Sequence, residues 1–297
     1  MFFIIGAPKS GTTALWQYLR SHPQIRMPID KEAPYFASRL MQKKGWDWYM
    51  SEYFSDITED IELGSASPQY MSFPKSSEDI AKSFPDAKII AVLRDPIERA
   101  ASHYKMMKKR GIETRSFDEA IKDQLSPGHQ ERYRSYNYDA VKDSDETNTY
   151  VAHSEYKRIL SFYFELFPRN QILLINDTDL LNDRVNTFKK VLTFIGVDNE
   201  YLPSNLQSNF HVGGTRRKRD HIIDYFIKLA PLKIIAKALL PKSLQKAIAF
   251  KLTTRNQIPE DLEICEKTKQ SLKTHFAPDM EWLRSEGLDT TRWVKTS

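Results

Sequence analysis

The chain has one cysteine, Cys265, in 297 residues, so it cannot form an internal disulfide. It also lacks any run of about 18 consecutive apolar residues, which is the length that a membrane-spanning helix needs. The first residues, Met1–Gly6, are apolar but have no basic segment before them, and the run is too short for a secretion signal. We therefore expect an intracellular protein and predict that it is cytoplasmic.

The sequence has no internal repeat, no low-complexity linker and no cysteine and histidine spacing typical of zinc sites, so we predict no metal site. Apolar residues make up 40% and charged residues 28%, which excludes collagen-like and wholly disordered chains. The length allows one large domain or two small ones. We predict a single domain over residues 1–297, in which a helical C-terminal part, about residues 221–297, packs on the remainder.

The net charge of +5 is unevenly distributed. Residues 211–255 carry eleven lysines and arginines against two aspartates, so the rest of the chain is net negative. A segment of this kind favours an anionic partner, such as nucleotide phosphates, nucleic acid, an acidic membrane surface or an acidic glycan. The pattern is equally typical of a solvated basic face. Apolar residues beside the lysines of residues 221–253 also allow contact with a membrane surface, without a transmembrane segment.

Short apolar runs alternate with helical patterns along the chain. The runs at residues 2–5, 88–93 and 171–176 predict buried strands, and helices are expected over residues 12–21, 96–110, 155–167, 185–195 and 260–286. Asp95 is the expected N-cap of the second helix, and Gly111 is its expected end. This alternation predicts an α/β fold, in which a parallel sheet carries helices on both faces and a C-terminal helical segment follows.

A glycine loop joins the first expected strand to the first helix, with the sequence Gly6-Ala7-Pro8-Lys9-Ser10-Gly11-Thr12-Thr13. Backbone N–H groups and the helix dipole hold an anion in this context. The Gly-x4-Gly spacing is that of a phosphate-binding P-loop, but Thr12 stands where the Walker lysine belongs and the lysine is Lys9. A sulfuryl group carries less negative charge than a phosphoryl group, so one ammonium without a metal could supply the main electrostatic stabilisation of its transfer.

Two segments resemble a known family. Pro8–Thr13 is similar to the 5′-phosphosulfate loop of sulfotransferases that use 3′-phosphoadenosine 5′-phosphosulfate (PAPS), and Arg94–Tyr104 is similar to their 3′-phosphate element. The resemblance is closest to the heparan-sulfate-type branch and its bacterial relatives. It implies transfer of a sulfuryl group to an acceptor hydroxyl, without a metal, leaving adenosine 3′,5′-bisphosphate. The donor would be held by Lys9, Ser10, Gly11, Thr12, Thr13, Ala14, Arg94 and Ser102.

The proton of the acceptor hydroxyl requires a base. Glu32, within Lys31–Phe36, matches the catalytic glutamate of the heparan-sulfate-type branch, and Lys9 would stabilise the leaving phosphate oxygen. The cytosolic small-molecule branch uses histidine instead, for which His103 and His22 are the candidates. Relatives often have Glu-Lys-(Thr/Ser)-Pro where this chain has Ser65–Pro68, so a heparan-like acceptor does not follow. We predict a carbohydrate hydroxyl, with glycolipid, phenol and tyrosine acceptors left open.

A late basic segment, residues 209–219, combines two glycines with four consecutive basic residues. The resemblance implies that such a segment closes over adenosine 3′,5′-bisphosphate, and Gly214, Arg216 and Arg217 are the best matches. Two other functions stay open. One is a P-loop kinase that uses ATP, which Thr12 disfavours. The other is a non-enzymatic anion-binding or nucleic-acid-binding protein, although no aromatic pattern for base stacking accompanies the charge and we predict no nucleic-acid partner.

Overall fold

The computed structural model describes residues 1–55, 57–58, 60–134, 146–208 and 262–293, and the backbone of residues 215–217 and 257–259. The chain divides into two compact units, Met1–His211 with Ile264–Ser297, and Val212–Glu263. The first unit contains the main sheet. In the second unit, strand β6 (Thr215–Arg217) pairs antiparallel with β7 (Gln257–Pro259). A single domain over residues 1–297 stays a prediction.

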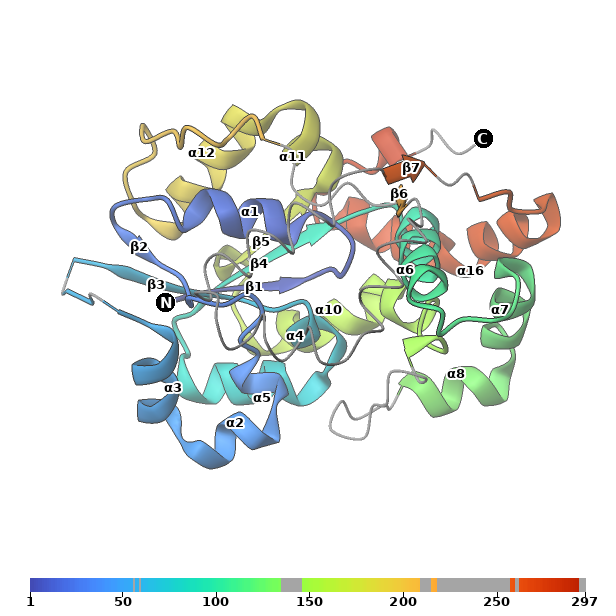
Figure 1. Cartoon of the computed structure of the whole chain (residues 1–297), viewed down its shortest axis with the longest axis horizontal. Helices are drawn as coiled ribbons and strands as arrows, with labels where there is room; N and C mark the ends of the chain where they lie inside the picture. The colour runs from blue at the N-terminus through green and yellow to red at the C-terminus, as the bar shows by residue number, and fades with distance from the viewer. Residues whose placement is uncertain are drawn as a thin grey trace, which may run out of the picture. The chain divides into compact units, whose positions relative to one another are not determined.

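The main sheet has five strands in the order β2-β3-β1-β4-β5, and every neighbouring pair is parallel (Figure 1). The strands are β1 (Phe2–Gly6), β2 (Ile25–Arg26), β3 (Glu62–Ala66), β4 (Lys88–Leu93) and β5 (Ile172–Asn176). Because all strands run in one direction, the loops that follow them leave from the same edge of the sheet. This is the edge at which open α/β sheets bind ligands. The predicted parallel α/β fold is confirmed.

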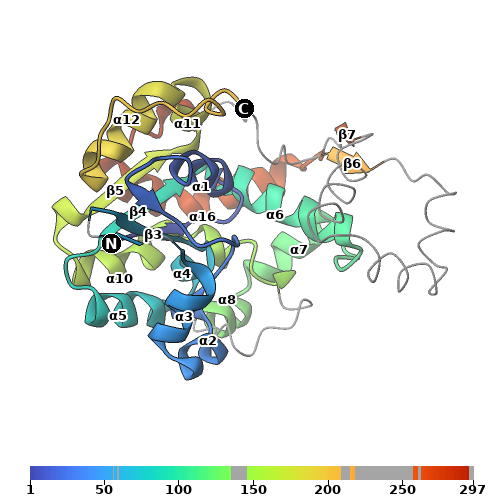
Figure 2. The same ribbon diagram turned by 60° about the vertical axis from the view of Figure 1, so that its left-hand side comes forward.

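Alternate residues of the central strand face opposite layers. Phe3 and Ile5 pack into a core with α4 (Gln69–Ser72), α5 (Pro74–Ser83) and α10 (Tyr156–Leu166). Phe2 and Ile4 pack into a second core with α1 (Thr12–Leu19), α11 (Asp177–Asn182) and α12 (Arg184–Ile195). Figure 2 shows these two groups of helices on opposite faces of the sheet. Burial of each such side chain contributes about 1.5–3 kcal/mol, so β1 is anchored from both sides.

Further helices belong to the first unit, and the longest of them follow the sequence prediction closely. Helix α6 (Pro96–Arg110) begins and ends as expected, since the Asp95 side chain accepts hydrogen bonds from the amides of Ile97 and Glu98, and Gly111 has a φ of 75°. The others are η1 (Tyr35–Ala37), α2 (Arg39–Lys44), α3 (Trp46–Tyr53), α7 (Phe117–Gln124), α8 (Pro127–Arg134), η3 (Ala152–Ser154), η4 (Arg169–Gln171), α16 (Glu266–Ser285) and η5 (Thr291–Trp293).

Strands β2 and β3 were not expected from the sequence. β2 has two residues, and β3 contains Gly64 and Ser65, which are weak strand formers. A Cβ atom at Gly64 would lie within 2.6 Å of the Phe2 ring and of the Met27 sulfur, so this strand approaches its neighbours too closely for a side chain. Packing in three dimensions therefore makes this segment a strand, because its local sequence does not favour one.

The C-terminal helix α16 belongs to the first unit and packs on its other helices. The carboxylate of Asp279 in α16 accepts a hydrogen bond of 2.8 Å from the amide of Lys157 at the start of α10. Beyond α16, the indole N–H of Trp293 donates to the Asn176 side chain at the carboxyl end of β5. The predicted helical C-terminal segment is thus present in α16, while residues 221–253 lie outside the described residues.

Candidate active site at the carboxyl edge of the sheet

The loop after β1 contains two residues in the left-handed region of backbone space, Lys9 at φ 73° and Gly11 at φ 91°. For a non-glycine residue this conformation costs about 1–3 kcal/mol, and such residues cluster at ligand-binding sites. A left-handed residue in a tight turn directs successive N–H groups into one concavity, which binds anions. Helix α1 then begins at Thr12 without a side-chain cap, so its first N–H groups stay available to a ligand.

Ser10 gives an independent indication of an anion site. The residue is 1% exposed, and within the described part of the chain its Oγ atom has no hydrogen-bond partner. A buried hydroxyl without a partner is costly, and an acceptor oxygen at this loop would relieve that cost. The loop backbone also comes close to the layer beneath it, because a Cβ at Gly6 would lie 2.6 Å from the Met71 sulfur. The Ser10 hydroxyl therefore adds a buried donor to the anion site that the loop backbone indicates.

The ammonium of Lys9 lies over helix α6. Its Nζ atom is 3.7 Å from the thioether sulfur of Met106, a weak acceptor. Burial lowers the pKa of Lys9, and the positive charges of Arg110, Arg94 and Arg99 lower it further. No carboxylate of the described residues forms an ion pair with this lysine. The ammonium thus faces a local excess of positive charge that a bound anion would neutralise.

Arg94, at the carboxyl end of β4, joins the second predicted element to the first. One guanidinium nitrogen, Nη1, donates to the Lys9 carbonyl oxygen at 3.5 Å. Nη2 donates to Glu98 Oε2 at 3.0 Å, and Nε is 3.6 Å from Asp177 Oδ2. Ser102 is half-buried in α6, and its hydroxyl has no hydrogen-bond partner among the described residues. Two segments that are 85 positions apart in the sequence therefore meet at one edge of the sheet.

Three further predicted donor-binding residues lie at the start of α1. Thr12 is buried and Thr13 is half-buried. Ala14 is half-buried, and its amide donates to the Gly11 carbonyl at 2.9 Å, so this N–H group is already used within the helix. The unused N–H groups therefore precede Ala14.

Glu32 lies in the segment that follows β2, and this segment starts at the same edge of the sheet as the loop of Lys9. Its Oε1 atom is 3.4 Å from the Lys31 ammonium, and its side chain is about one-third exposed. The next carbonyl along the chain, that of Ala33, accepts hydrogen bonds from the Tyr49 hydroxyl at 2.9 Å and the Tyr70 hydroxyl at 3.3 Å. Two buried tyrosines therefore fix the backbone next to an accessible carboxylate.

The two histidines considered as alternative bases are both buried. The Nε2 atom of His22 lies 2.8 Å from the Asp198 carbonyl, and its Nδ1 atom accepts from the Gln24 amide, so both ring nitrogens have backbone partners. His103 lies on α6 with Nε2 3.5 Å from Glu146. Burial and the charge of Arg99 hold the pKa of His103 well below its ordinary value.

Arg99 and Met106 complete the face of α6 that lies toward Lys9, and the sequence interpretation gave neither a role. Arg99 is fully buried and donates to the Ser154 hydroxyl and the Tyr150 carbonyl. Its Nη1 atom has no hydrogen-bond partner among the described residues, and burial lowers its pKa to about 10. The helical spacing of residues 99, 103, 106 and 110 is a sequence signal that could have identified this face.

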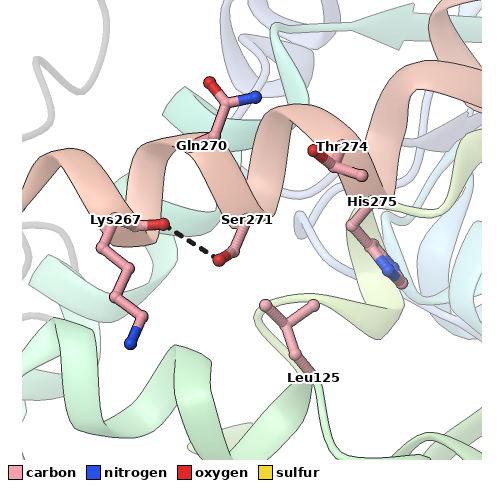
Figure 3. A pocket seen from close by; sticks show the side chains of 6 residues that line it. All are labelled: Leu125, Lys267, Gln270, Ser271, Thr274 and His275. Carbon is pink, nitrogen blue, oxygen red and sulfur yellow. Dashed lines mark hydrogen bonds between the residues drawn. The ribbon is translucent and has the colours of Figure 1, made fainter.

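The other predicted positions give less information. Gly214 lies outside the described residues, and Arg216 and Arg217 are described only as backbone in β6, where Arg216 pairs with Ile258. A pocket of about 560 Å³ opens between α16 and the end of α7 (Figure 3). It is lined by Leu125, Lys267, Gln270, Ser271, Thr274 and His275, none of which was a predicted site residue. In the described part of the chain, no three His, Cys, Asp or Glu residues group as a metal site would require.

The sulfotransferase domain family matches residues 1–212, which include the loop of Lys9, Glu32 and Arg94. The chain belongs to this family. The human bifunctional heparan sulfate N-deacetylase/N-sulfotransferase 3 is 32% identical to this chain over an alignment of 206 residues. The alignment covers 66% of this chain and 22% of that protein. The mouse heparan sulfate glucosamine 3-O-sulfotransferase 3B1 is 27% identical over 65% of this chain and 45% of its own length. The chain thus spans less than half of these curated relatives.

A solved structure supports the same assignment. The sulfotransferase from Alicyclobacillus acidocaldarius covers 77% of this chain and 91% of its own, with a TM-score of 0.58 and 27% sequence identity. Among the helices of the described residues, none combines the length and apolar character needed to cross a bilayer. The predicted family is therefore confirmed, and the predicted cytoplasmic location stays a prediction.

Proposed function

We propose that this sulfotransferase-family protein transfers the sulfuryl group of PAPS to an acceptor hydroxyl. The observation that carries the proposal is the loop after β1, which contains a buried unpartnered Ser10 hydroxyl and Lys9 and leads into the uncapped N–H groups of α1. Arg94 lies within hydrogen-bond reach of the same loop, so the edge of the sheet carries a second cationic side chain, which is paired with Glu98 and Asp177. That arrangement suits a nucleotide with anionic groups at both its 5′ and 3′ positions.

The residues of the loop would bind and orient the donor. When bound, PAPS supplies an activated sulfuryl group whose departure leaves negative charge on a phosphate oxygen. The N–H groups at the start of α1 and the Ser10 hydroxyl would hold the 5′ group, and the Lys9 ammonium would stabilise the developing charge. The Lys9 ammonium serves this purpose because the described residues provide no carboxylate to neutralise it.

Glu32 is the proposed general base. Its carboxylate is accessible, and the Ala33 carbonyl beside it is fixed by two tyrosine hydroxyls, so the backbone that carries the base is rigid. It would accept the proton of the acceptor hydroxyl as that oxygen attacks sulfur. His22 is a weaker candidate because both of its ring nitrogens are already engaged.

A carbohydrate hydroxyl is the proposed acceptor. The support is the similarity to two enzymes named for heparan sulfate. In addition, the sequence around Glu32 resembles the segment with the catalytic glutamate of the heparan-sulfate-type branch. The end of β3 differs from the Glu-Lys-(Thr/Ser)-Pro pattern that relatives of the resembled branch often have, since Ala66 stands at the lysine position and is buried. We therefore propose a glycan or glycolipid whose recognition does not depend on a lysine at this position.

Calorimetric titration of the full chain with adenosine 3′,5′-bisphosphate and with ADP, without added metal, tests the donor site. We expect the bisphosphate to bind at least tenfold more tightly than ADP, since only it places a phosphate at the 3′ position. Transfer of ³⁵S from labelled PAPS is then measured onto desulfated heparan, a glycolipid, a small phenol and a tyrosine peptide. Equal binding of the two nucleotides, or magnesium-dependent turnover of ATP, would favour a kinase instead. Salt-sensitive DNA binding without bisphosphate binding would favour a nucleic-acid-binding protein.

A further inference from the structure

Arg94 is held by two carboxylates that differ in their surroundings. Asp177, the first residue of α11, is 9% exposed, and its Oδ2 atom is 3.6 Å from Arg94 Nε. Glu98, in the first turn of α6, has a side chain that is 36% exposed and an Oε2 atom 3.0 Å from Arg94 Nη2. The guanidinium therefore has a buried partner on its Nε side and an accessible partner on its terminal nitrogen.

The buried carboxylate of Asp177 has little freedom to move away from Arg94. Asp177 begins α11, whose N-cap Asn176 is fixed through its bond to the Thr178 amide. Within the described residues, the ion pair of Asp177 is with Arg94, and its Oδ1 atom has no hydrogen-bond partner. A carboxylate in this position would lose its main favourable contact if Arg94 moved away. Asp177 thus keeps Arg94 in place.

The accessible carboxylate is not required for local structure. Asp95 caps α6 and already accepts from the amides of Ile97 and Glu98, so the Glu98 side chain takes no part in the cap. Since it is partly exposed, the Glu98 carboxylate can turn into water and regain its hydration at small cost. It occupies a terminal nitrogen of Arg94, which is one of the nitrogens that bind phosphate in a forked arrangement.

We propose that Glu98 occupies, in the free protein, the place on Arg94 that a nucleotide 3′-phosphate takes, and that Asp177 is a positioning residue that orients Arg94 toward that phosphate. This inference rests on the proposed function and assigns Glu98 and Asp177 to the selection of 3′-phosphorylated nucleotides. A dianionic phosphate displaces the single charge of Glu98 because it carries more charge and more acceptor oxygens. It leaves Asp177 in place on the Nε atom of the guanidinium.

Burial raises the pKa of Asp177 to about 6, against the opposing effect of Arg94, and the neighbouring charges of Asp95 and Glu98 raise it as well. The Thr178 N–H group acts in the other direction. The ion pair with Arg94 favours the ionised form of Asp177, which its positioning role requires.

The test compares the affinities of the full chain for adenosine 3′,5′-bisphosphate and for AMP, which lacks the 3′-phosphate, by calorimetry at neutral pH. For Glu98→Gln we expect about fivefold tighter binding of the bisphosphate and unchanged binding of AMP, because the competing charge is removed. For Asp177→Asn we expect about tenfold weaker binding of the bisphosphate, again with unchanged AMP. Asp179→Asn is the matched control, because Asp179 lies on the same helix and pairs with Arg292.

The outcomes separate this inference from the proposed function. If the parent protein does not prefer the bisphosphate over AMP, the proposed function fails. If the parent prefers it and Glu98→Gln leaves that preference unchanged, the role of Glu98 is wrong. If Asp177→Asn tightens bisphosphate binding, Asp177 is only a repulsive charge and not a positioning residue. Where Asp177→Asn does not fold, Asp177→Ser takes its place with the same expected loss, and AMP binding reports the intact fold.

Discussion

Two lysines at the same edge of the sheet have opposite electrostatic surroundings. Lys9 follows β1 and Lys31 follows β2, and burial is the largest cause that lowers the pKa of each. The Lys9 ammonium is near arginines and a thioether, whereas the Lys31 ammonium is 3.4 Å from the Glu32 carboxylate. Among the described residues, the Lys9 ammonium therefore has no carboxylate counterion, and the loop after β1 is suited to an added anion. The loop after β2 contains its own counterion, and that counterion is the proposed base.

The largest effect should separate the two lysines directly. Lys9→Ala should reduce sulfate transfer from PAPS by about 10³-fold, because it removes the charge that stabilises the leaving oxygen. Lys31→Ala should reduce transfer by less than about tenfold, since Lys31 compensates a charge within the protein. Initial rates with labelled PAPS measure both, and thermal unfolding checks that each variant folds. Equal losses of transfer rate in the two variants would contradict the proposed difference between Lys9 and Lys31.

The second test concerns the carboxylate of Glu32, the proposed base. Glu32→Gln should lower kcat by about 10²-fold to 10³-fold, because the amide cannot accept the hydroxyl proton. Its affinity for adenosine 3′,5′-bisphosphate should stay unchanged, since the loop after β1 is intact. Glu52→Gln, on the exposed side of α3, is the control for loss of a carboxylate in the same region. A Glu32→Gln enzyme with the parent kcat would remove Glu32 as the base.

Arg94 lies next to the loop after β1 and is the proposed contact of the nucleotide 3′-phosphate. Arg94→Ala should weaken bisphosphate binding by about 10-fold to 100-fold, in line with the loss of a charged hydrogen bond of about 1.5–3 kcal/mol. AMP binding should change much less. Titration calorimetry measures both ligands, and Arg20→Ala, which removes an exposed arginine that lies over Trp16, serves as the control. A parallel loss of AMP affinity would mean that Arg94 acts on the loop as a whole.

The pH dependence of activity should also distinguish Lys9 from Lys31. Both have folded-state pKa values below those of the unfolded chain, so the unfolded state binds more protons and the contribution of each lysine to stability rises with pH. Activity should move in the opposite direction, because the Lys9 ammonium loses its proton as pH rises through its lowered pKa. The alkaline limb of kcat/KM should therefore lie below the ordinary range of lysine and shift upward in Lys9→Arg. If the alkaline limb of kcat/KM has the same pKa in Lys9→Arg as in the parent enzyme, another group causes this limb.

The smallest expected effect concerns the support of the second loop. Tyr49→Phe removes a hydrogen bond of 2.9 Å to the Ala33 carbonyl and should lower the free energy of unfolding by about 1 kcal/mol. Transfer should fall only a few-fold, because the Tyr70 hydroxyl still reaches the same carbonyl. Denaturant titration and initial rates give the two quantities. A loss of activity as large as that of Glu32→Gln would mean that Tyr49 acts on the reaction itself.

The features that could be predicted from the sequence are those with local causes. The bounds of α6 follow from Asp95, Pro96 and Gly111, all within or next to the helix. The strands β1, β4 and β5 are continuous apolar runs, which is how strands buried on both faces are recognised. β3 could not be predicted in this way, because Gly64 and Ser65 favour no strand and only contact with β1 makes them one.

The sequence by itself determined the order of strands, loops and helices and the residues that stand at the carboxyl ends of β1 and β4, since these depend on neighbours along the chain. Only the tertiary structure decided which charges face one another. The pairing of Arg94 with Asp177 and the contact of Lys9 with Met106 join positions more than 80 residues apart. Their energies depend on distance and burial, and those quantities are set when the sheet and its helices pack together.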